Sequence, residues 1–160
     1  MKVRRFAPCL TVATILAMSN AMASHTTLFD SMGGEPVLRA AVDRFTEMAV
    51  SDPRINFTFA EADLSKFRQL LYDQLCELSG GPCHYTGRDM RTAHAKLGIN
   101  TAEFNALTED LYLALGKAGV PYRLQNRLIA LLAPMKRDIV KAPHAPDPEF
   151  PTPDASAPAP

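Results

Sequence analysis

His94 has the side chain best suited to chemistry in this sequence, because it lies among apolar residues at helical spacing. Met90 comes four residues before it and Leu97 three residues after it, so all three share one face of a predicted short helix, residues 89–97. A buried histidine bonded to a carbonyl is the commoner explanation of such an arrangement. A metal ligand is the alternative, since neutral imidazole readily binds transition metals. A helix this short is unstable alone, so something must hold it in place.

Cys76 and Cys83 are the second candidate for chemistry. Six residues separate them, and these include the reversal Gly80-Gly81-Pro82. That reversal could bring the two Cα atoms within the roughly 4.4–6.8 Å that a disulfide requires. A disulfide is therefore expected if the chain reaches an oxidising compartment. A redox switch is the alternative, and only the proximity of the two thiols supports it.

The first 23 residues are typical of a secretory signal peptide. Residues 1–5 are basic and contain no acid, a mostly apolar stretch follows, and Ala21-Met22-Ala23 has the small residues that signal peptidase requires. A membrane anchor is the alternative, but the apolar stretch of about 13 residues is shorter than the ~20 that span a bilayer. We therefore predict cleavage after Ala23, a periplasmic or secreted protein, and no membrane association once residues 1–23 are gone.

The last segment, residues 142–160, contains seven prolines among its nineteen residues. Such a density excludes a helix or a central strand and predicts a flexible, disordered tail. An inert tail and a proline-rich ligand for a partner both remain open.

The charge balance argues against a nucleic-acid partner. The whole chain has 17 basic and 17 acidic residues. Loss of Lys2, Arg4 and Arg5 with the leader leaves 14 basic against 17 acidic residues, a net charge of about −3. Three cysteines are too few for a disulfide-rich scaffold.

The remaining residues, 24–141, are predicted to be all-α. Apolar residues recur at helical spacing, and no window alternates as a strand would. Glycine, proline and capping residues separate the expected helices, and Asn100 with Glu103 has the spacing of a capping box. Pro134 is expected to kink the last helix. The expected helices cover approximately residues 36–51, 64–78, 89–97, 101–118 and 122–139.

An ordered set of motifs resembles the truncated haemoglobins, specifically group I, over residues 27–140. The motifs are Gly33-Gly34, Phe59, Gly80-Gly81-Pro82, Tyr85 with Gly87, Met90 with His94, Gly98-Ile99, Phe104 and Gly119-Val120-Pro121. The resemblance implies a two-over-two helical sandwich around one haem b. It also identifies His94 as the proximal iron ligand and residues 24–141 as the globin domain.

The resemblance further implies a mostly apolar set of haem contacts, each of which is otherwise an ordinary core residue. We give Phe59 and Phe104 most weight, since aromatic residues are scarce and tryptophan is absent. Tyr85 is expected to be structural. The full set is Phe59, Phe67, Leu71, Tyr85, Met90, Ala93, Leu97, Ile99, Phe104, Leu128 and Leu132.

The distal side departs from the family. Many group I members carry a tyrosine and a glutamine where this sequence has Thr46 and Leu71. A donor facing bound dioxygen is worth roughly 1.5–3 kcal/mol, or about ten- to a hundred-fold in dissociation rate. Thr46 is shorter than tyrosine, and Gln74 is a second candidate donor. With Phe67 and Leu71 beside them, we expect a largely apolar distal pocket that releases oxygen quickly.

The favoured function is therefore a haem protein that binds dioxygen or nitric oxide at ferrous iron. An enzyme is the first alternative, either a nitric oxide dioxygenase or a weak peroxidase working with an unseen reductase. A peroxidase pocket normally contains a distal acid–base group, and none is evident. Residues 62–79 contain no histidine, which disfavours a sixth iron ligand from the chain itself. A helical interaction protein without cofactor is the second alternative, in which His94 belongs to the core.

Overall fold

The computed structural model describes residues 26–140, and all regular secondary structure in this range is helical, which confirms the all-α prediction. The predicted signal peptide and proline-rich tail lie outside the described residues. Within residues 26–140 no helix is both long enough and apolar enough to cross a bilayer. The elements are α1 Leu28–Met32, α2 Gly34–Ser51, η1 Asn56–Phe59, α3 Leu64–Leu78, α4 Met90–His94, α5 Thr101–Lys117, α6 Tyr122–Leu132, η2 Ala133–Met135 and α7 Lys136–Ile139.

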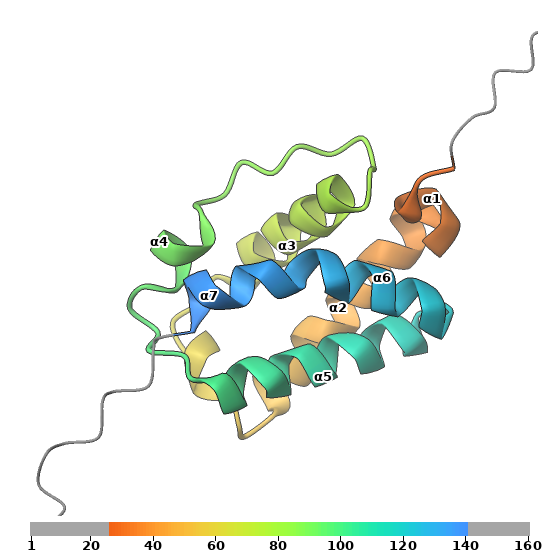
Figure 1. The fold of residues 1–160 in the computed structure, drawn as a ribbon. Helices are drawn as coiled ribbons and strands as arrows, with labels where there is room; N and C mark the ends of the chain where they lie inside the picture. The colour runs from red at the N-terminus through yellow and green to blue at the C-terminus, as the bar shows by residue number, and fades with distance from the viewer. Residues whose placement is uncertain (1–25, 141–160) are drawn as a thin grey trace, which may run out of the picture.

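Two helix pairs, α2 with α3 and α5 with α6, form the body of the fold. Helix α2 packs against α3 and also against α5, and α5 in turn packs against α6 (Figure 1). The short helix α4 lies at the end of the molecule where α7 ends, and it packs against α7. The turn between α5 and α6 lies at the opposite end (Figure 1). A long segment without helix connects α3 to α4.

The core lies where α2 meets its neighbours. Its largest fully buried side chains come from α2, the following turn, and helices α3, α5 and α6, as the amphipathic spacing predicts. They are Leu38, Val42, Phe45, Thr46, Ile55, Leu75, Cys76, Leu115 and Leu128. Because these side chains belong to both helix pairs, the pairs share one continuous core.

Local signals account for most helix ends. Asn100 accepts a hydrogen bond from the backbone N–H of Glu103, and the Glu103 side chain accepts one from the backbone of Asn100, which makes a capping box. The kink expected at Pro134 is present as the 3-10 turn η2, which divides the last predicted helix into α6 and α7.

Two helices differ from the prediction. The helix predicted over residues 89–97 ends at His94, because the following residues form a turn that leads to Gly98 at a φ of +66°. The sequence pattern also missed α1, which is too short to show a periodicity. Thr27 and Asp30 cap it, and its buried residues Leu28, Phe29 and Met32 join the core.

Candidate functional site

His94 lies at the end of α4, and its ring has a defined orientation. Its Nδ1 is 2.8 Å from the carbonyl oxygen of Met90, one turn earlier. A carbonyl can only accept, so Nδ1 carries a proton and donates, which in the neutral ring leaves the lone pair on Nε2. The ring is half-buried. The helix itself is held by Asp89, whose carboxylate accepts from the backbone N–H of Thr92. The arrangement suits a neutral imidazole that binds a metal through Nε2.

An apolar wall extends from η1 to α3. The rings of Phe59 and Phe67 meet edge to face with centroids 5.2 Å apart, and Phe67 lies 6.3 Å from the buried ring of Phe45. Phe59, Phe67 and Leu71 pack against the core from one side only and stay half-buried. Large apolar side chains left half-buried together offer a surface to another apolar group.

The other predicted haem contacts differ in burial and fall into three groups: buried, half-buried and exposed. Ile99 and Leu128 are buried in the protein, and Leu132 packs half-buried against the core. Met90, Ala93 and Phe104 are half-buried around α4 and the start of α5. Leu97 is 39% exposed, because the turn after His94 takes it off the helical face that the sequence predicted. A half-buried apolar set next to a neutral imidazole fits a flat, apolar, iron-containing ring such as haem.

Thr46 is fully buried on α2, and its hydroxyl is already used. Its Oγ1 donates to the carbonyl of Val42 at 2.8 Å. A hydroxyl has one proton to donate, so Thr46 offers none to a ligand in this rotamer. The structure therefore differs from the expectation that Thr46 is available as a distal donor.

Gln74, the second candidate donor, points its amide at sulfur atoms. Its Nε2 lies 3.3 Å from Sδ of Met90 and 3.7 Å from Sδ of Met135. Thioether sulfur is a weak hydrogen-bond acceptor, so these contacts orient the amide but provide only weak hydrogen bonds to it. The contacts connect α3 to α4 and to η2 beside the half-buried apolar set.

Tyr85 is half-buried and bonds within the segment that leads into α4. Its hydroxyl donates to the carbonyl of Arg88 at 2.7 Å, which closes the turn before α4. Burial raises the pKa of this tyrosine above its ordinary value, so it stays protonated as a donor.

Cys76 and Cys83 are joined by a disulfide with a Cα–Cα distance of 5.7 Å. It connects the last turn of α3 to the segment that leads into α4. A Cβ on Gly81 would come within 2.6 Å of Cys76 Sγ, so glycine is required where the chain passes the bridge. Glu77 adds a second connection to this segment, because its carboxylate bonds to His84 and to the backbone N–H of Tyr85. These two bonds, that to His84 first, lower the pKa of Glu77.

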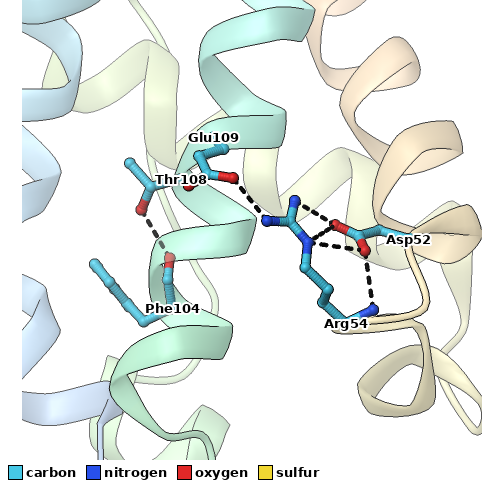
Figure 2. A network of polar contacts seen from close by, with 5 residues as sticks. All are labelled: Asp52, Arg54, Phe104, Thr108 and Glu109. Atoms are coloured by element: carbon cyan, nitrogen blue, oxygen red, sulfur yellow. Dashed lines mark hydrogen bonds and ion pairs between the residues drawn. The ribbon is translucent and has the colours of Figure 1, made fainter.

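Sequence reasoning missed an ion-pair network on α2 and α5. Arg54 contacts Asp52 and Glu109, each at 2.7 Å, and joins the end of α2 to α5 (Figure 2). Bonds from Arg54 lower the pKa of Asp52. The dipeptide Asp52-Pro53 is typical of a helix end followed by a turn, but nothing in the sequence indicates the partner on α5.

Asp110 is the buried acid next to this network. Its side chain is only 5% exposed, and Oδ2 has no hydrogen-bond partner among the described residues. Desolvation by burial is the main cause that raises its pKa, and the nearby charge of Asp52 acts in the same direction.

Comparison with known proteins agrees with this geometry. Residues 27–141 match the family described as bacterial-like globin. A group 1 truncated hemoglobin of Synechocystis is 38% identical over 121 residues, which are 72% of this chain and 98% of that protein. The crystal structure of the Tetrahymena pyriformis truncated hemoglobin in its Fe(III) form superposes with a TM-score of 0.70 at 28% identity, covering 72% of this chain and 99% of that one.

A second solved structure has the same fold. The 2/2 hemoglobin of Synechococcus, solved in the cyanomet state with covalently attached heme, superposes with a TM-score of 0.66 at 27% identity and covers 71% of this chain and 98% of that one. The helices of residues 26–140 therefore have the two-over-two arrangement. This chain belongs to the bacterial-like globin family and, within it, to the group 1 truncated haemoglobins.

Proposed function

We propose that this protein holds one haem b through His94 and binds a small diatomic gas, dioxygen or nitric oxide, at the ferrous iron. The observation that carries the proposal is the 2.8 Å bond between His94 Nδ1 and the Met90 carbonyl. It fixes the tautomer in which Nε2 can bind iron and makes that nitrogen a better electron donor. Haem, when bound, would supply a redox-active iron that can bind a small gas.

The side chains around the site determine how a ligand is received. Phe59, Phe67 and Leu71 form an apolar wall that excludes water from the space beside them. The hydroxyl of Thr46 donates its proton to the carbonyl of Val42. These contacts support a largely apolar distal side, where ligand size and access matter more than hydrogen bonding.

Replacement of the proposed iron ligand tests the function. We expect His94→Ala to abolish the Soret absorption of the purified protein, because no other described histidine lies on α4. His84→Ala is the matched control, since His84 is exposed and bonds only to Glu77. It should retain the full spectrum. A protein that stays colourless after haemin is supplied, or a His94→Ala variant with an unchanged Soret band, would contradict the proposal.

Nitric oxide dioxygenation in the same pocket is the enzymatic alternative, and it requires an external reductase. Turnover of nitric oxide by the oxygenated protein with a chemical reductant separates the two functions. Stoichiometric binding without turnover supports a binding protein, whereas repeated turnover supports the enzyme.

We also propose export to the periplasm or the cell exterior. The leader of residues 1–23 is one reason, and the Cys76–Cys83 disulfide, which persists in oxidising compartments, is the other. N-terminal sequencing of the protein from the periplasmic fraction should begin at Ser24. A cytoplasmic protein that keeps Met1 would contradict this proposal.

A further inference from the structure

An open hollow lies between the end of α5 and the start of α6, far from the proposed haem site. The turn between α5 and α6, where these two helix ends meet, lies at the opposite end of the molecule from α4 (Figure 1). We call the open space between these helix ends the α5–α6 hollow. Its lining residues are Tyr112, Leu113, Gly116, Lys117, Tyr122 and Gln125.

The walls of the hollow are two tyrosine rings. The rings of Tyr112 and Tyr122 stack with centroids 6.3 Å apart and an angle of 29° between their planes. The hydroxyl of Tyr112 donates to Asn126, which fixes its ring. Tyr122 and Leu113 are large apolar side chains, yet they are 71% and 55% exposed. Such an aromatic surface, left open to solvent, is of the kind that binds proline-rich segments.

Gly116 and Gln125 also line the hollow, and the lack of a side chain at Gly116 keeps it open. A Cβ on Gly116 would come within 3.4 Å of Nε2 of Gln125, so a larger side chain there would extend into the hollow. Gln125 is held from below, because its amide donates to the carbonyl of Val120 at 2.7 Å. The hollow therefore depends on glycine at position 116.

The chain carries a segment of suitable composition close to hand. Residues 142–160 include seven prolines and one aromatic residue, Phe150. Proline favours the polyproline II conformation, which rises ~3.1 Å per residue, so Phe150 can reach about 31 Å from Val140. The helical path back from Val140 to Tyr122 is about 27 Å long at 1.5 Å per residue. The region around Phe150 is thus at the right distance to meet the hollow.

Charge favours the same pairing. Residues 142–160 contain Asp147, Glu149 and Asp154 and no lysine or arginine. The route along α6 and the edge of the hollow carry Arg123, Arg127 and Lys117, all exposed. Among residues 26–140 none of these three cations takes part in an ion pair, unlike Arg39, Arg54, Arg68, Arg91 and Arg137. Three acids and three free cations are complementary.

We propose that residues 146–153 of the same chain dock in the α5–α6 hollow, with Phe150 and its neighbouring prolines against Tyr112 and Tyr122. A short tether gives an effective concentration on the order of millimolar. Docking therefore occupies a substantial fraction of molecules even if the free segment binds only with millimolar affinity. The contact would cover the exposed side chains of Leu113 and Tyr122.

Fluorine NMR tests the proposal on the carbon monoxide-bound holoprotein labelled with 3-fluorotyrosine. The chain has four tyrosines, so the resonances of Tyr112 and Tyr122 report on the hollow while Tyr72 and Tyr85 serve as internal references. The Tetrahymena structure, matched over 99% of its length by 72% of this chain, lacks a counterpart of the tail, so a chain ending at Lys141 should fold. We expect this truncation to shift the Tyr112 and Tyr122 resonances and to leave the other two in place.

Two variants of the full chain make the test specific. Gly116→Leu fills the hollow, and Phe150→Ala removes the proposed anchor, so each should reduce the effect that truncation has on Tyr122. Ala102→Leu is the matched control, because Ala102 is exposed at the other end of α5. It should behave as the wild type. About 1 M salt, which shortens the screening length to ~3 Å, should weaken the docking by screening the acidic segment from the cations.

The outcomes that overturn the proposal are distinct. If truncation leaves the Tyr112 and Tyr122 resonances unchanged, the tail does not dock there. If the resonances move with protein concentration in the full and truncated chains alike, a second copy occupies the hollow instead. Loss of haem binding would disprove the proposed function but not this docking proposal, since the lining residues of the hollow are not among the proposed haem contacts.

Discussion

Leu71 offers the sharpest test of the proposed distal side, because a single substitution there adds a hydrogen-bond donor at a position that now has none. Leu71 is half-buried beside Phe67. Glutamine has nearly the volume of leucine, so Leu71→Gln changes polarity with little change in packing. We expect the variant to release oxygen more slowly than the wild type.

The size of the expected change in the oxygen dissociation rate depends on which hydrogen bonds Thr46 and Gln74 already make. Thr46 Oγ1 donates to Val42 at 2.8 Å, and Gln74 Nε2 lies against sulfur atoms 3.3 and 3.7 Å away. Thr46 therefore offers no proton to a ligand in this rotamer, and the Gln74 amide is directed at sulfur atoms. One new hydrogen bond to a charged or partly charged group is worth about 1.5–3 kcal/mol, which lowers the dissociation rate roughly ten- to a hundred-fold.

Stopped-flow displacement of oxygen by carbon monoxide measures this rate directly. Leu71→Met is the matched control, since it keeps the size of the side chain and adds no donor. We also expect Thr46→Val to change the rate by less than about twofold, because it removes a hydroxyl that the helix already uses. A Leu71→Gln rate equal to the wild type, together with a Thr46→Val rate raised tenfold or more, would show that Thr46 faces the ligand and would refute this reasoning.

Three further predictions concern stability and folding. Replacing both Cys76 and Cys83 by alanine should lower the free energy of unfolding by about 2.5 kcal/mol. This is the chain-entropy value for a disulfide between cysteines at a sequence separation of 7. Urea denaturation that is the same with and without the disulfide would show that the bridge contributes nothing to stability. Burial raises the pKa of Asp110, so the folded state holds this proton more tightly and stability falls as pH rises from 3.8, the unfolded value, through the folded pKa. Asp110→Asn should therefore have a higher free energy of unfolding than the wild type at neutral pH, and this advantage should disappear below pH 3.8. If the two proteins differ in stability by the same amount at every pH, titration of Asp110 is not the cause. Removal of haem should lower hydrogen-exchange protection over residues 82–100 more than elsewhere, because α4 has only five residues and gains stability from its ligand; equal protection with and without haem would contradict that dependence.

The sequence predicted the features whose signals lie within a few residues of each other. Asn100 and Glu103 form a capping box three residues apart, and Pro134 interrupts the last helix through its own ring. Apolar spacing predicted the core faces of α2, α3, α5 and α6 for the same reason. Helices of five residues are too short to show a periodic pattern. Only the structure therefore revealed α1 and the end of α4 at His94.

Contacts between distant residues required the tertiary structure. Arg54 bonds to Glu109 across 55 residues, and Gln74 contacts Met135 across 61, which no local pattern predicts. The α5–α6 hollow likewise depends on how two helices meet around Gly116.

The difference is clearest at Thr46. Its residue type and its place on a predicted helix could be read from the sequence. Whether its hydroxyl donates to a ligand or to Val42 depends on the rotamer that the packed core permits. The sequence by itself determined the longer helices, the motif order and the imidazole at position 94, because these depend on the spacing of residues close together in the chain. Only the folded chain decided which polar atoms remain free, because that depends on neighbours that packing brings together.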